Sequence, residues 1–343
     1  SLHDALPISF STSADTLAYL EKYAADGFAD RAEVELLQNR VPKILADGLS
    51  PAICPEQPEL EWCPPGHGDL YPALLGSGWL DRLLADGVKY AFVSNSDNLG
   101  AQLDMNFLRW FEESGAPFVM EVTRRTEADR KGGHLAVRKS DGQLILREVA
   151  QCPDEDIPEF QNISRHRYFN TNTLWIRLDA LKEILDANGG VLPLPMIRNK
   201  KTLNPRDPES APVYQLETAM GAGIECFPGA RAVNVPRSRF FPVKTTSDLF
   251  LLRSDAIAVD EHGNVALAPE RQGNTPVVDL DSKLYKLVDS LDGLGLPSLI
   301  GMDKLTLRGR FHFQDGAVLR GTLLMENDSD ETKEILPGVY AGA

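Results

Sequence analysis

From residue 88 onward, the sequence alternates between apolar runs typical of buried strands and segments with the apolar spacing of helices. Residues 88–94 (VKYAFVS) form one such run, and residues 103–113 after it place their apolar side chains at helical intervals. The same reasoning predicts further strands at 117–122 and 171–178 and further helices at 178–187, 213–225 and 247–255. Such alternation is typical of an α/β fold with a mixed, mainly parallel sheet.

Three other segments have local signals of their own. Residues 13–26 have the spacing of a helix, with Ser13 or Asp15 as the expected N-cap. The proline-rich stretch 49–66 predicts a loop, because proline removes a backbone donor. A hairpin is expected from two strand-like runs, residues 135–138 and 144–150.

The last part of the chain has a different pattern. From about residue 298 it consists of short β-rich units with recurrent glycines and no helical spacing. A few coils of a β-helix fit this pattern, and an antiparallel hairpin is the alternative. We therefore predict a candidate non-native start at 1–10, a main α/β domain at 11–255, a linker at 256–297 and a β-helix domain at 298–343.

Composition excludes several functional classes for this chain of 343 residues. The formal net charge of −15 disfavours binding to nucleic acid phosphates. No apolar run reaches the roughly 20 residues needed to span a bilayer, and the start has no pattern of a secretory leader. The cysteines lack zinc-site spacing and are interpreted as reduced thiols: Cys54, Cys63, Cys152 and Cys226. These features predict a cytoplasmic protein that does not act on membranes.

Polar residues follow the strand at 88–94 directly, in the order Asn95, Ser96, Asp97. In open α/β sheets, ligands bind at the carboxyl ends of the strands. A carboxylate at such a place suits Mg²⁺, which prefers one or two carboxylates plus phosphate oxygens. Asp97 is therefore a candidate Mg²⁺ ligand, and capping of the next helix is the alternative role.

Two glycine-containing loops are candidates for close contact with a ligand. In residues 62–71 (WCPPGHGDLY), Gly66 allows the backbone to approach a flat ligand, and His67 offers a hydrogen bond to an anionic oxygen. In the second loop, Lys131 and two glycines, the second being Gly133, precede a strand. A simple turn explains either loop about as well.

Two more motifs suggest contacts with sugar and phosphate. Asn170 and Asn172 alternate along the start of a strand, so that their side chains share a face and need hydrogen-bond partners. Lys244 lies just before the helix at 247–255, for which Ser247 is the expected N-cap. Free N–H groups and the helix dipole favour an anion there. Backbone partners for the asparagines and a solvated charge for Lys244 are the alternatives.

Together these motifs resemble those of one family in their order and rough spacing. QNRVPKI, PPGHGDLY, VSNSDNLG, ADRKGG, EVAQCPDE, YFNTNTLW, QLETAMGAGIE and NVPRSRFFPVKTTSDLFLL occur here as in the eukaryotic-type UDP-glucose pyrophosphorylases. The resemblance covers residues 10–330. It implies a Rossmann-like nucleotidyltransferase domain followed by a left-handed β-helix, through which some members form homo-oligomers.

The resemblance also implies a reaction and roles for individual residues. The family makes UDP-glucose and pyrophosphate from UTP and glucose 1-phosphate, with Mg²⁺ as cofactor. Attack is in line at the α-phosphorus, and orientation and charge neutralisation supply the catalysis. By resemblance, the nucleotide side comprises Gln38, Gly66, Asp97 and Lys244, with Asp97 and Lys244 as the catalytic pair. The sugar side comprises His67, Asn95, Gly133, Glu148 and Asn172.

Two departures from the family pattern leave alternatives open. Thr173 stands where the commoner sequence has a third amide, and the family's glycine-rich phosphate loop upstream of the helix near Leu17 has no counterpart here. We therefore expect a uridylyltransferase that is N-terminally truncated and impaired. The alternatives are a UDP-sugar or UDP-N-acetylhexosamine pyrophosphorylase of broader specificity, and a non-catalytic protein that binds uridine nucleotides.

Overall fold

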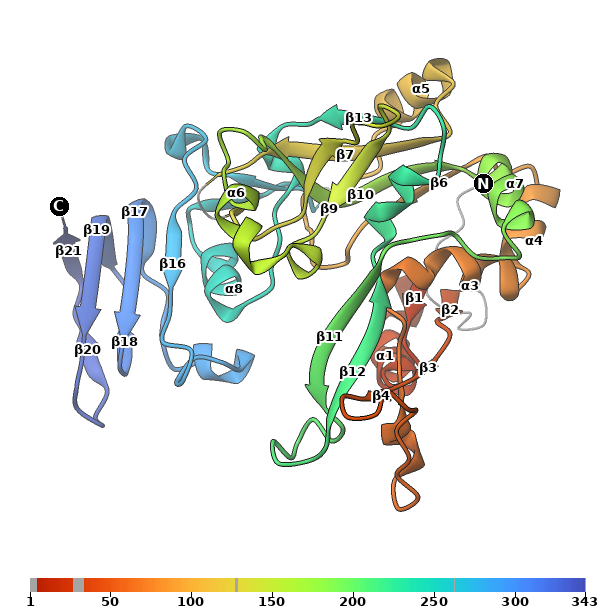
Figure 1. The fold of residues 1–343 in the computed structure, drawn as a ribbon. Helices are drawn as coiled ribbons and strands as arrows, with labels where there is room; N and C mark the ends of the chain where they lie inside the picture. Colours follow the sequence, from red (N-terminus) through yellow and green to blue (C-terminus); the bar gives the residue numbers. More distant parts are fainter. Residues whose placement is uncertain (1–4, 27–33, 127–128, 262, 343) are drawn as a thin grey trace. The chain divides into compact units, whose positions relative to one another are not determined.

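The computed structural model describes residues 5–26, 34–126, 129–261 and 263–342, drawn in Figure 1. The chain divides into two compact units. The first unit comprises residues 1–93 and 103–235, and the second comprises residues 94–102 and 236–343.

A six-stranded sheet organises the first unit. Its path is β13-β7-β10-β8-β9, and β6 pairs with β10 beside this path. The strands are β6 (Tyr90–Val93), β7 (Phe118–Arg124), β8 (His134–Val137), β9 (Leu144–Arg147), β10 (Tyr168–Arg177) and β13 (Arg231–Asn234). Each sequence-predicted strand and the predicted hairpin therefore form part of one sheet.

The sheet is mixed, as expected. Strand β10 runs antiparallel to β6, β7 and β8, whereas β13 runs parallel to β7. Thus β6, β7, β8 and β13 share one direction, and β9 and β10 run the opposite way. Because β10 lies in the middle, only the β13–β7 pairing is parallel among the described strands of this sheet.

Both faces of the sheet are buried, because successive side chains of the central strands pack into cores on opposite faces. Leu174 and Ile176 of β10 pack into the larger core, and Trp175 between them packs into a smaller aromatic core. The larger core contains residues of α3 (Leu70–Gly76), α4 (Trp79–Ala85) and α7 (Leu178–Ala187), and the smaller contains residues of α5 (Met105–Ser114). The unit therefore has the layered packing of an α/β fold.

The rest of the first unit consists of short elements. Strand β1 (Leu6–Ile8) pairs in parallel with β2 (Glu35–Leu37), so residues 6–8 have regular structure. The predicted N-terminal helix is α1 (Ser13–Leu20) continued by the 3₁₀ turn η1 (Glu21–Asp26), and its N-cap is Thr12. The remaining helical segments are η2 (Pro58–Glu61), η3 (His67–Asp69), η5 (Val149–Gln151), η6 (Asp154–Asp156) and α6 (Ile157–Phe160).

The helix predicted at 213–225 was wrong. The structure has a strand, β12 (Pro212–Thr218), followed by the 3₁₀ turn η7 (Met220–Glu225). Seven residues of β12 pair antiparallel with β11 (Met196–Thr202), and β12 also pairs with β4 (Ile44–Leu45). Pairing with two neighbours overrides a weak local helix preference. Two further short strands, β3 (Val41–Pro42) and β5 (Trp62–Cys63), pair with each other.

The second unit is built mainly from parallel strands. One sheet has the order β16-β17-β19-β21, β18 pairs with β20, and all of these pairings are parallel. The alternative of an antiparallel hairpin is therefore wrong, and parallel pairing is the arrangement that coils require. The strands are β16 (Val277–Asp279), β17 (Ser298–Arg308), β18 (Phe311–Phe313), β19 (Ala317–Glu326), β20 (Lys333–Ile335) and β21 (Gly338–Ala341).

The predicted domain boundaries need correction at residues 236–297. Residues 236–255, predicted to belong with the main domain, lie in the second unit. Residues 256–297, predicted as a linker, supply Ile257, Leu280, Leu294 and other side chains to its buried core. Besides β16, the described elements of residues 236–297 are η8 (Arg237–Arg239), α8 (Thr246–Arg253), β14 (Ile257–Val259), β15 (Val265–Leu267), η9 (Pro269–Arg271) and η10 (Val288–Leu291). None of the described helices has both the length and the apolar composition needed to cross a lipid bilayer.

Candidate functional site

The candidate residues fall into two groups, one in each unit. Six of them lie in the first unit: Gln38, Gly66, His67, Gly133, Glu148 and Asn172. The second unit holds the other three: Asn95, Asp97 and Lys244. The contacts within each group follow.

The backbone conformation at position 66 and a close neighbouring residue both exclude any residue other than glycine there. Its φ is +82°, and a Cβ on it would lie 2.6 Å from the carbonyl oxygen of Thr218. Only glycine accommodates both constraints without strain. The Gly66 carbonyl in turn accepts a hydrogen bond from Nε2 of Gln38 at 3.2 Å, so two predicted uracil contacts are joined directly.

His67 is oriented by the backbone of the next structural element. The Met220 backbone N–H, at the start of η7, donates to Nδ1 of His67 at 3.0 Å. With Nδ1 as an acceptor, the neutral ring carries its proton on Nε2. The exposed imidazole can therefore present a donor, which is the role expected of His67 toward an anionic oxygen.

Asn170 and Asn172 are neighbours, although not through regular strand alternation. The pairing of β10 with β7 shifts its register between Asn170 and Thr173, and Asn172 has a left-handed φ of 56°. Nδ2 of Asn170 donates to Oδ1 of Asn172 at 2.7 Å, and the Asn172 backbone N–H donates to Oδ1 of Asn170 at 2.9 Å. A positive φ outside glycine is often associated with a functional site.

Gly133 and Glu148 lie against each other at the open end of the β8–β9 hairpin. A Cβ on Gly133 would lie 2.4 Å from Oε1 of Glu148, so the carboxylate occupies the space that a side chain would need. The Gly133 carbonyl accepts from the Asn170 backbone N–H at 3.0 Å. These contacts bring together three of the four sugar-side candidates in the first unit: Gly133, Glu148 and Asn172.

The turn η7 joins the two sides of this group. Met220 contacts His67, and the next residue, Gly221, packs so closely on Asn170 that a Cβ would lie 2.7 Å from its Nδ2. The six candidates of the first unit therefore form one continuous network, from Gln38 at one end to Asn172 and Glu148 at the other. The sequence did not single out η7 as the connection.

In the second unit, Asp97 and Lys244 are brought together by backbone pairing. The Val243 N–H donates to the Asp97 carbonyl at 2.8 Å, and Asn98 forms an isolated antiparallel bridge with Pro242. Lys244 directly follows this paired segment. Asn98 is buried and secures the pairing by accepting from the Phe241 N–H at 2.8 Å, a role that sequence reasoning missed.

Asp97 has a buried carboxylate oxygen available to a ligand. Its Oδ1 is buried and has no hydrogen-bond partner in the part of the chain that the structure describes. Burial of a carboxylate oxygen without a partner is costly. A hard cation would satisfy this oxygen, so Asp97 fits the role of a Mg²⁺ ligand. Within the described ranges, no three His, Cys, Asp or Glu side chains gather into a metal cage.

Lys244 and Asn95 flank the same pairing. Lys244 is exposed, and its backbone N–H donates to Asp248 Oδ2 at 3.0 Å. The N-cap of α8 is Thr245, which forms a capping box with Asp248, so the Ser247 cap predicted for this helix was wrong. Asn95 accepts through its carbonyl from the Asn98 N–H at 3.1 Å, within the turn after β6.

Sequence reasoning also missed a group of buried polar residues behind the sugar-side residues. Glu121 is fully buried and accepts from Nε1 of Trp175 at 2.9 Å. Arg125 is buried and donates to several backbone carbonyls, among them Phe160 O at 3.1 Å and Arg130 O at 2.6 Å. Buried polar side chains of this kind have little local sequence signal, because partners such as Phe160 for Arg125 and Trp175 for Glu121 are distant in the chain.

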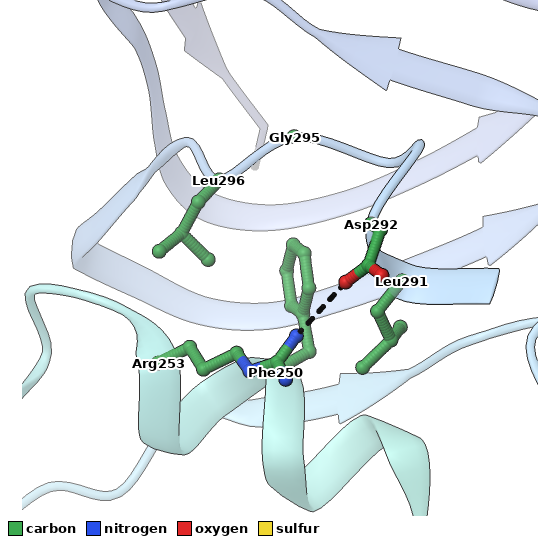
Figure 2. Close-up of a pocket in the computed structure, with 6 residues that line it drawn as sticks. All are labelled: Phe250, Arg253, Leu291, Asp292, Gly295 and Leu296. Carbon is green, nitrogen blue, oxygen red and sulfur yellow. Dashed lines mark ion pairs between the residues drawn. The ribbon is translucent and has the colours of Figure 1, made fainter. Parts of the chain in front are cut away.

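Two cavities of the described chain are lined by none of the candidate residues. A cavity of about 200 Å³ in the second unit is lined by Phe250, Leu291 and Leu296 beside an Arg253–Asp292 ion pair of 3.7 Å (Figure 2). Arg253 ends α8, whereas Lys244 lies two residues before its first residue, so the length of this helix, about 12 Å, separates them. A second cavity, in the first unit, is lined by residues near the start of β6.

Comparison with known proteins finds relatives of the whole chain. A sequence model described as UTP–glucose-1-phosphate uridylyltransferase matches residues 5–320. The uridylyltransferase of Saccharomyces cerevisiae is 43% identical over 320 residues, which are 92% of this chain and 62% of the yeast protein. That of Solanum tuberosum is 39% identical over 333 residues, 96% of this chain and 67% of the potato protein.

Solved structures are similar as well. The open and closed structures of the UDP-glucose pyrophosphorylase from Leishmania major align with a TM-score of 0.90 and 47% identity, covering 99% of this chain and 76% of that one. A point mutant of the Leishmania major enzyme in complex with UDP-glucose aligns at 0.89 and 46%, covering 100% and 76%. This chain thus spans about 62% of the length of the yeast relative.

Proposed function

Because the chain belongs to the UTP–glucose-1-phosphate uridylyltransferase family, we propose that it forms UDP-glucose and pyrophosphate from UTP and glucose 1-phosphate. The observation that carries this proposal is the continuous polar network of the first unit. It connects the pair Gln38 and Gly66 with the pair Glu148 and Asn172 through η7. A molecule with a base at one end and a hexose at the other suits a network of this composition.

In the proposed complex, Gln38 and Gly66 recognise the uracil. A carboxamide offers both a donor and an acceptor, and the backbone of a glycine loop can approach a planar base closely. Gly133, Glu148 and Asn172 contact the hexose hydroxyls, since a carboxylate accepts hydrogen bonds and an amide does both. His67 and Asn95 lie on the sugar side, with His67 donating to a phosphate oxygen.

Lys244 and Asp97 serve the reacting phosphates. An oxygen of glucose 1-phosphate attacks the α-phosphorus of UTP, the bond from that phosphorus to the bridging oxygen breaks, and pyrophosphate leaves. The attacking oxygen is already anionic, so the chain needs no general base, and Lys244 stabilises the accumulated negative charge. Asp97 would hold Mg²⁺, which when bound neutralises phosphate charge. The buried, unpartnered Oδ1 of Asp97 supports this assignment.

The proposal also covers the C-terminal coils, the oligomeric state and the localisation of the enzyme. We propose that the C-terminal coils wind as a left-handed β-helix, that this part can join copies of the chain into a homo-oligomer, and that the enzyme is cytoplasmic. The parallel pairing of β17 with β19 and of β19 with β21 supports the coil. Sedimentation would measure the oligomeric state.

The direct test combines binding and turnover. Calorimetry should detect binding of UTP and UDP-glucose, and pyrophosphate release should require UTP, glucose 1-phosphate and Mg²⁺ together. Comparable release with several sugar phosphates would favour a broader UDP-sugar or UDP-N-acetylhexosamine pyrophosphorylase. Binding of uridine nucleotides without release from any sugar phosphate would show a non-catalytic uridine-binding protein. Absence of both binding and release would overturn the proposal.

A further inference from the structure

Asp69 occupies a helix N-cap position without capping its helix. It directly precedes α3, where an aspartate usually accepts hydrogen bonds from the first free N–H groups of the helix. No such side-chain bond is present, although the residue is only 5% exposed. Burial raises the pKa of this carboxyl group above its ordinary value, so the position is costly for a charged group.

Both carboxylate oxygens of Asp69 accept hydrogen bonds from the same residue, which is distant in the chain. Oδ2 accepts from the backbone N–H of Asn39 at 2.7 Å, and Oδ1 accepts from the Asn39 side-chain Nδ2 at 3.0 Å. Asn39 follows Gln38 in the chain. The carboxylate therefore fixes the backbone next to Gln38 and leaves little freedom for that segment to move.

The loop that carries Asp69 is itself fixed. A Cβ on Gly68 would lie 2.3 Å from Oγ1 of Thr218, and Gly66 contacts the same residue of β12. Gln38 donates to the Gly66 carbonyl at 3.2 Å. The segment 38–39 is thus attached to the loop at two points, one through the side chain of Gln38 and one through Asp69.

Orientation of the Gln38 carboxamide matters because of the chemistry of the bases. Uracil presents an N3–H donor beside the O4 acceptor, whereas cytosine presents an N3 acceptor beside an N4 amino donor. A carboxamide that is free to rotate by a half turn can satisfy either base, since its oxygen and nitrogen exchange places. Only a carboxamide held in one orientation discriminates between them.

We propose that Asp69 is a positioning residue for base selection: by holding Asn39, it keeps the Gln38 carboxamide oriented for uracil and against cytosine. The inference rests on the proposed function, in which Gln38 reads the base. Asp69 itself does not contact the nucleotide. Its effect therefore appears in the preference for UDP over CDP, which a merely structural role would not change.

The test is calorimetric titration of the whole chain with UDP and with CDP. The wild-type protein should prefer UDP. Asp69→Asn is nearly isosteric but puts an N–H₂ group against one of the Asn39 donors, so the ratio of the two affinities should fall by about tenfold. Asp104→Asn is the matched control: Asp104 caps its own helix α5, and asparagine is an equally good cap, so the ratio should not change.

Two further measurements distinguish a loss of folding from a loss of base selection. Thermal melting shows whether Asp69→Asn is folded, and Asn39→Ala, at an exposed position that keeps its backbone bond, should lower the ratio by a smaller factor. A wild-type protein that binds neither nucleotide overturns the proposed function and this inference with it. A wild-type preference for UDP that remains unchanged in both Asp69→Asn and Asn39→Ala overturns the inference alone.

Discussion

Gly66 shows how a single residue can be restricted by its backbone and its neighbour at once. Its positive φ already disfavours any residue with a Cβ, and the Thr218 carbonyl occupies the place where that atom would lie. The two effects are separable, because other glycines of the chain have a similar φ with open space around them. Gly48 is one of these, with a φ of +77° and no atom within 4 Å of the Cβ position.

We expect Gly66→Ala to lower the free energy of unfolding by about 2–4 kcal/mol, the sum of backbone strain and overpacking. Gly48→Ala should cost only the backbone strain, about 1–2 kcal/mol. Urea denaturation of both variants measures the difference. Affinity for UDP should fall in Gly66→Ala alone. Equal losses of stability in the two variants would contradict the role of the Thr218 contact.

Asp97 offers a second prediction for a single residue. Asp97→Asn keeps the shape of the side chain but removes the charge that a divalent cation requires. Mg²⁺ should tighten UTP binding to the wild-type protein and should have no such effect on the variant, as measured by calorimetry with and without Mg²⁺. Asp303→Asn, an exposed aspartate of β17, is the control and should behave as wild type. An unchanged Mg²⁺ effect in Asp97→Asn would remove Asp97 from the metal role.

Among the structural elements, the β8–β9 hairpin depends on a buried histidine. His134 is fully buried in β8, stacks on His166 with ring centroids 4.1 Å apart, and has its pKa lowered to about 3 by burial and by nearby cations. The neighbouring side chains that lower the pKa of His134 are His166, Arg125 and Arg147. Glu159 of α6 forms an ion pair with His166 when that ring is protonated. Gly133, one of the sugar-side candidates, directly precedes β8, so it lies at the start of this hairpin.

This histidine makes stability depend on pH. The folded-state pKa lies below the unfolded value of about 6.5, so its contribution is present above pH 6.5 and is lost as the pH falls toward the folded pKa. We expect a loss of about 1.4 kcal/mol per pH unit below that value, measured by urea denaturation between pH 7.5 and 5. His134→Gln should flatten this dependence, whereas His312→Gln, in β18, should not. An equally steep loss in His134→Gln would contradict the assignment.

The predictability of each element follows from where its stabilising contacts lie. Helix α7 occupies the predicted range, because its apolar spacing and its packing agree. Segment 213–225 was predicted wrongly because β12 is stabilised by pairing with β11 on one side and on the other with β4, which lies far away in the chain. Likewise Ser247, expected to cap α8, instead accepts from the Leu280 N–H at 3.1 Å. Local propensity cannot anticipate partners supplied by distant segments.

At the scale of the whole molecule, the chain has separate cores in its two units, and the short segment 94–102 belongs with the C-terminal part. That segment carries Asn95 and Asp97. Its attachment to residues 241–243 by backbone hydrogen bonds accounts for this membership. The candidate phosphate residues therefore belong to the same unit as the parallel C-terminal strands.

Hydrogen exchange followed by mass spectrometry can test this division. Leu305→Ala removes a fully buried side chain from the second core and should destabilise it by about 2–5 kcal/mol. Exchange should then rise in residues 236–343 and also in 94–102, while β7 and β10 stay protected. Leu174→Ala, in the core of the first unit, should give the reverse pattern. Protection of 94–102 that follows the first unit in both variants would contradict the division.

Apolar periodicity and motif order are local properties of the chain, and they were enough to predict the α/β class, most strands and helices, and the candidate residues Gln38, Asp97 and Lys244. The tertiary structure was needed to find the antiparallel pairing of β10 with β6, β7 and β8, the β12 strand, the unit boundary at residue 236 and the burial of Asp69 and His134. The physical reason is that pairing and burial depend on contacts between segments far apart in the chain, and such contacts can outweigh local preference.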